Sequence, residues 1–494
     1  MAGRVLIIGA GIGALATAIR LAEKGFHVEV FEKNPGPGGK ISEIRDKGYR
    51  FDTGPSLFTL PDLINELPGS HEPKLKYTRL STISKYYFPD GKIFSAPGDP
   101  ESFCNELASV IGVDENKVAL YLDAAASLYE LTAPIFIFSS FQRLNKLFKQ
   151  DNLGVLKGMI KFNPGSSMHS FNRKTLNNDK AVQIFDRYAT YNGSNPYKAP
   201  ATLNIIAHLE HNLGAYFPQG GMYRIVKHLY ENARKSNVTF HFENEVTEIM
   251  VENQRALGVI ASGRKHNADI VVSGGDVFRT YRELMKKTRP PRTVRKPRYS
   301  SSAMIFYLGV KNLFSDLDVH NIFFSKNYRA EFASIFSKTT AGIYKDPTVY
   351  IYNSSKLEKN DAPPGCSNLY VMINVPADKG EDWNALSRDA RRIIFEKLKR
   401  EHEMDIEPRV EFEMAATPAS IERDTLSTSG ALYGNNSNSI LSAFNRHPNF
   451  SRKIENLFFA GGSVHPGGGI PLCLASAKIV EEEIMLYHKK IKCG

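Results

Sequence analysis

The chain has 494 residues, of which 42% are hydrophobic and 23% charged, and a formal net charge of +11. This length suffices for two or three domains with a large core, and the composition excludes an intrinsically disordered protein. No run of about 18 apolar residues is found, so a transmembrane helix is not expected. The positive charge suits an anionic membrane surface or an ordinary solvated surface. Nucleic acid is not expected as a partner, because no nucleic-acid-binding motif is found.

The first residues and the cysteines indicate a location. The stretch MAGRVLII runs directly into apolar residues and lacks the form of a signal peptide. The four cysteines are scattered, without the spacing of metal ligands: Cys104, Cys366, Cys473 and Cys493. We therefore expect reduced thiols, a cytoplasmic location and no metal site.

A glycine motif follows the first apolar run. Val5 to Ile8 is typical of a parallel strand covered on both faces. Gly9, Gly11 and Ala14 then have the G-x-G-x-x-G/A spacing. The first position allows a tight turn, the second lets the backbone approach a pyrophosphate, and the third lets helix and strand pack closely. The pyrophosphate would lie at the start of the following helix, where free N–H groups favour negative charge.

A second strand ends at an acidic residue. Phe26, Val28 and Val30 alternate up to Glu32, which lies about 20 residues beyond the glycines. A carboxylate at this place accepts hydrogen bonds from ribose hydroxyls and repels a 2′-phosphate, which disfavours NADP. Strand, glycines, helix, strand and acid in this order predict a dinucleotide site. The alternative is a helix–strand turn with chance glycines.

Further glycine loops indicate a flavin. Two more loops follow: the loop with Gly39 and Lys40, and the turn Thr53 to Ser56. An NAD site does not need them, but an FAD site does, because FAD lies extended across its domain. Near the other end, a short buried strand leads into the glycine-rich turn from Gly461, and Pro471 suits the first turn of the last helix. N–H groups at that helix start could face the flavin pyrimidine. Ordinary surface turns are the alternative.

The sequence pattern of the middle of the chain indicates helices. Asp114 is expected to cap a helix that ends before Pro134. Residues 133–149 then suit a helix lying in a membrane interface, or a core-facing amphipathic helix. Its apolar residues have helical spacing, and its basic residues lie elsewhere on the helix: Ile137, Phe141, Leu144 and Phe148; Arg143, Lys146 and Lys149.

Later segments are assigned to two sheets. The strand regions 238–250 and 268–275 are placed on the nucleotide-binding sheet. The basic, proline-rich segment 286–298 is expected to mark a domain crossing. Residues 300–420 read as a second, mixed-sheet domain with a helix at 386–399.

The motifs together resemble the FAD-dependent carotenoid desaturases of the bacterial phytoene desaturase type, over nearly the whole chain. They include GAGIGAL, GGK, FDTGPS, ATYNGSNPYKAPA, FPQGGM and NLFFAGGSVHPGGGIP, in this order. Within that family, GGSVHPG is more similar to the 1-hydroxycarotenoid 3,4-desaturases, because first-step phytoene enzymes more often have threonine before HPG. Ala14 replaces a commoner glycine, and Lys40 stands where arginine is frequent, so a phosphate contact there would be a point charge.

The resemblance implies an α/β fold with a Rossmann-like FAD-binding domain, glutathione reductase/amine oxidase-like, and an inserted mixed-sheet and helical substrate domain. The expected FAD-binding domain comprises 1–70, 214–285 and 425–494. The substrate-binding domain comprises 71–213 and 286–424, with a membrane-associating helical part. FAD is expected to bind non-covalently. The predicted cofactor-binding residues are Gly9, Gly11, Ile12, Gly13, Ala14, Glu32, Lys33, Gly39, Lys40, Thr53, Gly54, Pro55, Ser56, Val246, Gly461, Gly462, Gly469, Ile470 and Pro471.

The implied reaction introduces a C3–C4 double bond into the acyclic, 1-hydroxylated end of a carotenoid, by hydride transfer to flavin N5 and proton loss. A multistep phytoene desaturase, an amine oxidase-type flavoenzyme and a non-enzymatic carrier are the alternatives. The expected partners are the carotenoid, a membrane surface bound peripherally from the cytoplasm, and oxygen or a quinone as electron acceptor. The 30 Phe and 22 Tyr residues could line a polyene tunnel, although core packing also explains them.

Three residues are candidates for the catalytic base. His465 stands in the glycine turn beside the expected flavin and could instead brace that turn by hydrogen bonding. Glu210 and Asp52 are further candidates, and for both the alternative is a partnered structural carboxylate.

Overall fold

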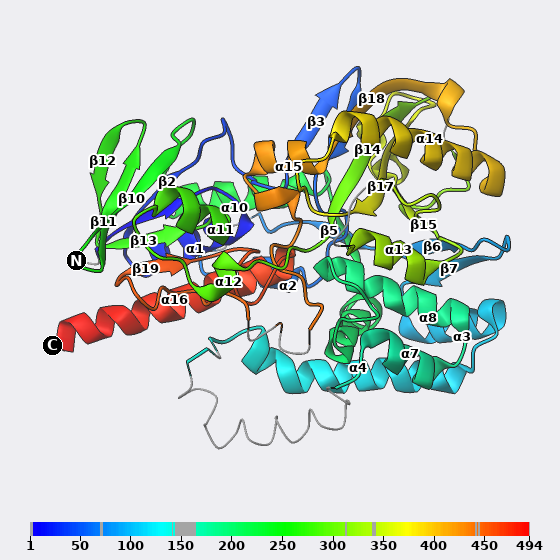
Figure 1. Ribbon diagram of the computed structural model, residues 1–494, viewed down its shortest axis with the longest axis horizontal. Coiled ribbons are helices and arrows are strands. Elements are labelled where there is room, and N and C mark those ends of the chain that lie inside the picture. Colours follow the sequence, from blue (N-terminus) through cyan, green and yellow to red (C-terminus); the bar gives the residue numbers. More distant parts are fainter. Residues whose placement is uncertain are drawn as a thin grey trace.

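The computed structural model describes residues 3–69, 73–140, 142–143, 165–311, 314–337, 342–439, 442 and 445–493. Figure 1 shows a parallel sheet with α16 on one side of the molecule and a larger sheet with α14 on the other. The helices α3, α4, α7 and α8 lie together below the larger sheet in this view. No helix within these ranges combines the length and apolarity that crossing a membrane would take.

The five-stranded sheet has the order β19-β13-β1-β2-β9, and all neighbouring strands are parallel. Its strands are β1 (Arg4–Ile8), β2 (His27–Phe31), β9 (Thr239–His241), β13 (Ile270–Ser273) and β19 (Leu457–Phe459). The two ends of the chain therefore meet in one sheet. The boundaries of the two expected domains stay a prediction.

The apolar run of β1 is buried on both faces, as the sequence predicts. Val5 and Ile7 pack in one core with the helices α1 (Ile12–Glu23), α10 (Tyr223–Lys235) and α16 (Ile470–Cys493). Leu6 and Ile8 point the opposite way into a second core with Val277 and Phe278 of α11 (Val277–Arg279). This alternation is what a strand covered on both faces requires.

The second core also contains a separate antiparallel sheet. It consists of β10 (Val246–Glu252), β11 (Arg255–Ala261) and β12 (Arg264–Asn267). The sequence places the whole region 238–250 on the nucleotide-binding sheet, which is correct for β9 but wrong for β10. β10 turns tightly at Asn253 and Gln254, both at positive φ, and pairs with its own hairpin partner instead.

The larger sheet is mixed, with the order β18-β14-β17-β16-β15-β6-β7. β6 and β15 are parallel and the other neighbours antiparallel. Its strands are β6 (Thr82–Tyr87), β7 (Ile93–Pro97), β14 (Ser302–Val310), β15 (His320–Phe323), β16 (Val349–Tyr352), β17 (Ser367–Val375) and β18 (Val410–Ala416). α14 (Trp383–His402) packs on it through Ile394 and Leu398. The predicted mixed sheet and helix are thus present, the helix being longer than expected.

The helical part has its own aromatic core beside this sheet. It contains α3 (Pro100–Ile111), α4 (Glu115–Phe136), α7 (Met168–Leu176), α8 (Asp179–Asp186) and α13 (Tyr328–Ile335). Asp99 and Asp114 cap α3 and α4 by accepting N–H groups of Ser102 and Asn116. α4 continues through Pro134 to Phe136, contrary to the expected end. Pro134 lacks the N–H that would bond to the carbonyl four residues earlier, and the helix ends two residues after it.

The segment 133–149 is not one helix in its described part. Residues 137–140 and 142–143 form turns and bends after α4 ends. Arg143 donates Nε to Glu483 of α16 at 2.6 Å and stacks on Phe450, so its half-buried side chain is bound to the protein itself. The predicted interfacial helix is therefore wrong for these residues. Phe141 and residues 144–149 lie outside the described residues.

The remaining described strands and α-helices are short. They are β3 (Glu43–Asp46) with β4 (Tyr49–Asp52), β5 (Tyr77–Arg79) with β8 (Tyr216–Pro218), α2 (Asp62–Asn65), α9 (Ile205–Ala207), α12 (Arg292–Arg295) and α15 (Pro418–Thr425).

Candidate cofactor and substrate site

A cavity of about 1680 Å³ opens at the carboxyl ends of the parallel strands. The loops after β1, β2, β13 and β19 all contribute to its wall. This crevice is where open α/β sheets bind ligands. Its volume exceeds the roughly 300–1,000 Å³ of ordinary ligand pockets, so it has room for a nucleotide together with a long second ligand.

The first glycine loop forms a cradle for phosphate. Gly9 has a φ of +88°, which suits the tight turn. Gly11 is the N-cap of α1 and gives no side-chain cap, and a Cβ built on it meets nothing within 4 Å. A Cβ on Gly13 would lie 2.8 Å from Gly461 Cα, so this glycine lets the two ends of the chain touch. The open space before the N–H groups of α1 fits a pyrophosphate.

Ala14 lies behind the cavity wall and not on it. It is 1% exposed, and a Cβ added to Gly274 would come within 2.7 Å of the Ala14 Cβ. The small residue thus allows close packing of α1 against the end of β13, the role expected of the third motif position.

Glu32 is held by two backbone amides. Its Oε2 accepts the N–H of Ala10 at 2.8 Å and its Oε1 accepts that of Asn34 at 2.9 Å. A carboxylate has about four acceptor positions, so capacity remains for ribose hydroxyls. The backbone amides therefore hold the carboxylate at the cavity wall before any ligand arrives.

Lys40 is buried on the cavity wall and binds backbone carbonyls. Its Nζ donates to Leu432 O at 2.6 Å and to Ala431 O at 3.1 Å. Burial lowers the pKa of Lys40, an effect that the charge of Asp276 opposes. One of the three ammonium donors remains for a phosphate contact.

The structure brings most of the predicted cofactor residues together. The cavity is lined by Gly9, Gly11, Ile12, Gly13, Glu32, Lys33, Gly39, Lys40, Thr53, Gly54, Pro55, Ser56, Val246, Gly461, Gly462, Gly469, Ile470 and Pro471. Ala14 is absent from this wall for the packing reason given above. Contact of each residue with the cofactor stays a prediction.

Two of the three candidate bases, Glu210 and His465, lie in different surroundings. Glu210 lines the cavity but accepts hydrogen bonds from Tyr191 Oη at 2.5 Å, Tyr188 Oη at 3.0 Å and Arg187 Nη2 at 3.4 Å. His465 does not line it: its Nε2 donates to Ser139 O at 3.0 Å, and burial lowers its pKa to about 4. These contacts favour structural roles, and the catalytic roles stay predictions.

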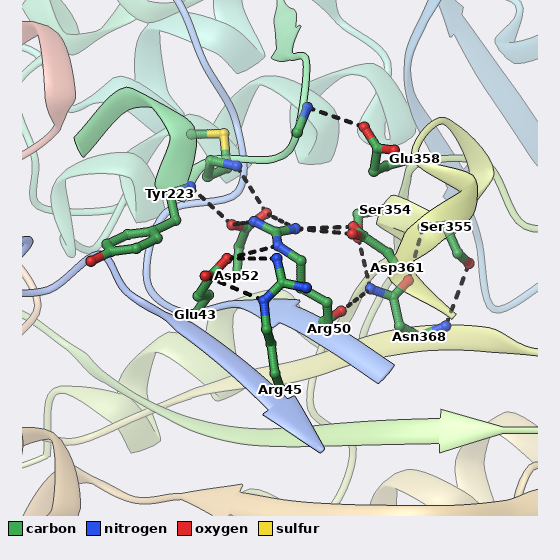
Figure 2. Close-up of polar contacts among 12 residues, drawn as sticks. Glu43, Arg45, Arg50, Asp52, Tyr223, Ser354, Ser355, Glu358, Asp361 and Asn368 are labelled. Atoms are coloured by element: carbon green, nitrogen blue, oxygen red, sulfur yellow. Dashed lines mark hydrogen bonds and ion pairs between the residues drawn. The ribbon is translucent and has the colours of Figure 1, made fainter. Parts of the chain in front are cut away.

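Asp52 belongs to a buried charge cluster away from the cavity, formed by Arg50, Asp52 and Asp361 (Figure 2). Asp52 accepts the N–H groups of Met222 and Tyr223, both at 2.9 Å, at the start of α10. Arg50 donates to Asp52 Oδ1 at 2.5 Å and to both oxygens of Asp361 at 3.1 Å. The cluster joins the β3–β4 hairpin to α10 and to the segment after β16. These contacts give Asp52 a structural role.

The far part of the cavity has an apolar, aromatic wall. Strands of the larger sheet supply Tyr307, Tyr350, Tyr370 and Met372, and the helical part supplies Tyr129, Phe136, Ile206, Leu209 and Phe332. The cavity therefore runs from the nucleotide-binding loops beneath the larger sheet to the helices. Some of the aromatic residues thus line this cavity, while others form the core of the helical part.

The sequence did not reveal several residues of this wall. Arg446 is 5% exposed and donates Nη2 to Asn192 Oδ1 at 2.8 Å and to Ser437 Oγ at 3.2 Å. Burial lowers its pKa to about 10, and its Nη1 finds no partner among the described residues. Arg446 precedes β19 in an irregular stretch without a recognisable pattern. The loop 274–276 could have been found, because its glycines end an apolar strand.

Comparison with known proteins agrees with this architecture. Residues 15–485 match the family described as flavin containing amine oxidoreductase. An oxidoreductase from Methanosarcina mazei has a similar fold, with a TM-score of 0.65 at 16% identity, covering 98% of this chain and 100% of that one. A putrescine oxidase structure, with putrescine bound, has a TM-score of 0.64 at 14% identity, covering 98% and 99%.

Relatives of known name cover the whole length. The chain is 45% identical over 484 residues to a 1-hydroxycarotenoid 3,4-desaturase of Flavobacterium sp. (strain P99-3), covering 97% of this chain and 99% of the relative. It is 30% identical over 496 residues to a 4,4'-diapolycopene oxygenase of Methylomonas sp., covering 98% of each. These matches confirm the predicted fold class and the predicted FAD cofactor. The protein belongs to the family of flavin-containing amine oxidoreductases.

Proposed function

We propose that the protein is an FAD-dependent carotenoid desaturase that introduces one C3–C4 double bond at an acyclic, 1-hydroxylated end. The observation that carries the proposal is the single cavity that joins the nucleotide-binding loops to a long aromatic wall. A polyene is an extended apolar molecule, and such a wall excludes water along it. The 45% identity to a protein named 1-hydroxycarotenoid 3,4-desaturase supports the same substrate class.

Desaturation removes a hydride and a proton from adjacent saturated carbons. When bound, FAD accepts the hydride with its two electrons, because such chemistry belongs to the cofactor. The N–H groups at the start of α1 and the Glu32 carboxylate would hold its phosphate and ribose groups. The wall around Tyr350, Tyr370 and Met372 would position the polyene and keep water out.

An amine substrate fits this wall less well. Recognition of an ammonium group calls for an unpaired carboxylate or an open aromatic cage. Glu210 is paired with Arg187 and two tyrosines, and Glu331 accepts the N–H and hydroxyl of Thr348 at 2.8 and 2.7 Å. The two carboxylates of the aromatic part are therefore already satisfied within the protein.

The proposal predicts a preference for a hydroxylated end. A substrate without the hydroxyl would leave a buried hydrogen-bonding group unpaired, which costs about 1–3 kcal/mol and corresponds to a roughly 5- to 150-fold lower kcat/KM. The test compares matched hydroxylated and non-hydroxylated carotenoids by the absorption shift from one added double bond. Equal rates on both, or successive desaturations starting from phytoene, would assign the protein to the multistep desaturases.

Peripheral binding to the cytoplasmic face of a membrane is part of the proposal, as is oxygen or a quinone as electron acceptor. The substrate dissolves only in lipid, and the net charge is +11. Thr132 and Phe136 at the end of α4, with Phe138 beyond it, line the cavity. The chain that follows, up to Lys149, thus starts at the cavity wall and carries basic residues.

Replacing Lys146 and Lys149 with glutamate should weaken binding to anionic vesicles. Each basic residue near such a surface contributes about 1 kcal/mol, so the double variant should bind at least roughly 30-fold less tightly. Co-sedimentation with vesicles of anionic and of neutral lipid measures this. The control reverses Arg388 and Lys399, two exposed residues of α14, which lies far from α4 in Figure 1. Equal loss in both variants, or none in the first, contradicts binding through this segment.

A further inference from the structure

Besides Nη1 of Arg446, two buried nitrogen atoms of residues that line the cavity lack a hydrogen-bond partner among the described residues. They are Nε2 of His320 and Nε of Arg187. Both residues line the cavity, and they are 2% and 7% exposed. Buried polar groups are nearly always paired, so two such atoms on one wall indicate a missing ligand group.

The imidazole of His320 is held in place by its neighbours. His320 starts β15, and its ring stacks at 14° on the rings of Tyr350 and Tyr352. Its Nδ1 lies 2.7 Å from Tyr350 Oη, which lies 2.6 Å from Ser56 Oγ. Ser56 belongs to the turn Thr53 to Ser56, which is predicted to bind the cofactor. Thus a chain of two short hydrogen bonds links the imidazole to the predicted cofactor-binding loop.

The positive charge of Arg187 is balanced by a carboxylate of the protein itself. Its Nη2 donates to Tyr86 Oη at 3.0 Å and to Glu210 Oε1 at 3.4 Å, and its guanidinium lies over the rings of Tyr188 and Tyr191. Because Glu210 balances the charge, the free Nε–H calls for a neutral acceptor and not for an anion. Burial and the charge of Arg187 lower the pKa of His320 to about 3, so the imidazole is neutral at pH 7.

We propose that His320, together with Arg187 of the same cavity, binds the terminal hydroxyl of the carotenoid substrate. A neutral imidazole has one donor and one acceptor nitrogen. Whichever way the hydrogen bond to Tyr350 runs, Nε2 is complementary to a hydroxyl, because a hydroxyl both donates and accepts. The hydroxyl is attached two carbons from C3. Binding it one tyrosine away from Ser56 therefore holds the C3–C4 bond close to the cofactor-binding loop. This inference rests on the proposed function.

The test is His320→Phe, which keeps a flat ring for stacking and removes both nitrogens. In holoenzyme of wild-type flavin content, the ratio of kcat/KM for matched hydroxylated and non-hydroxylated carotenoids should fall at least about fivefold. The change should come from a higher KM for the hydroxylated substrate. His320→Gln, whose amide reaches the place of Nε2, should retain more of the preference. An unchanged ratio, or the reverse order of the two variants, would overturn the inference.

His402→Phe is the matched control. The Nε2 of His402 is also buried without a partner among the described residues, and its ring packs on Tyr87 and Phe323, but His402 does not line the cavity. The substrate ratio should not change in this variant. If both variants lose the preference alike, loosened packing explains the effect and the inference is wrong.

If the His320→Phe variant is inactive, a binding measurement tests the inference instead. The desaturated, hydroxylated product should bind to the His320→Phe holoenzyme at least about fivefold more weakly than to wild type, measured by quenching of protein fluorescence. Equal binding would overturn the inference. Failure of the proposed function looks different, because the wild-type protein itself would then show no preference for hydroxylated carotenoids.

Discussion

Replacing Gly11 with aspartate is expected to leave the protein folded but without flavin. Gly11 has φ −72° and ψ 170°, which any residue adopts, and a Cβ built there meets no protein atom within 4 Å. Aspartate is also a preferred helix N-cap, so α1 itself should not suffer. The carboxylate would, however, occupy the N–H groups that the pyrophosphate needs. Like charges in contact cost several kcal/mol, so flavin affinity should fall by at least about 100-fold.

The flavin content of the purified variant, read from its visible absorption, measures this result. Circular dichroism shows whether the fold is kept. Gly11→Asn is the matched control, because asparagine caps a helix as well as aspartate and has nearly the same size without the charge. It should retain more flavin than Gly11→Asp. Full flavin content in the aspartate variant would mean that the phosphate site lies elsewhere.

Replacing Arg50 with methionine is expected to destabilise the protein strongly. Arg50 is 4% exposed and bridges Asp52 and Asp361, both buried, and it also donates to Glu43 at 3.0 Å (Figure 2). Removing one member of a buried ion pair leaves uncompensated charge, which costs about 3–5 kcal/mol of unfolding free energy. Urea unfolding of flavin-loaded protein measures the change. A loss below about 1 kcal/mol would contradict the structural role of the cluster.

Arg45→Met is the control for this experiment. Arg45 lies on the same hairpin and also pairs with Glu43, at 3.3 Å, but its side chain is 62% exposed. Exposed ion pairs contribute roughly 0–1 kcal/mol, so this variant should be nearly as stable as wild type. The two arginines thus differ in burial while sharing one carboxylate partner.

The stability loss of Arg50→Met should depend on pH. Burial already raises the pKa of Asp361 to about 6, although Arg50 opposes this shift. Without Arg50 the folded-state pKa should rise further above the unfolded value. The stabilisation from protonating Asp361 is then complete below the unfolded pKa and is lost as pH rises through the folded pKa. The variant should therefore be closer to wild type at pH 5 than at pH 8. An equal deficit at both pH values would exclude Asp361 as the uncompensated charge.

Local features of the site could be predicted from the sequence, because they depend on neighbours along the chain. The apolar β1, the turn at Gly9, the open N-cap at Gly11 and the acid at Glu32 are all set by backbone sterics and by periodicity within about 25 residues. That both chain ends contribute to one site could also be predicted, since each end carries a strand followed by a glycine turn. These segments need no distant contact to be recognised.

Only the tertiary structure decided how remote polar groups pair. It assigned Asp52 to the start of α10, Arg143 to Glu483, and β10 to a sheet of its own. His320 and Arg187 reach one cavity wall from positions 133 residues apart in sequence. No pattern in the sequence reports such a contact, because a buried polar side chain is stabilised by whichever partner the packing of distant elements brings to it.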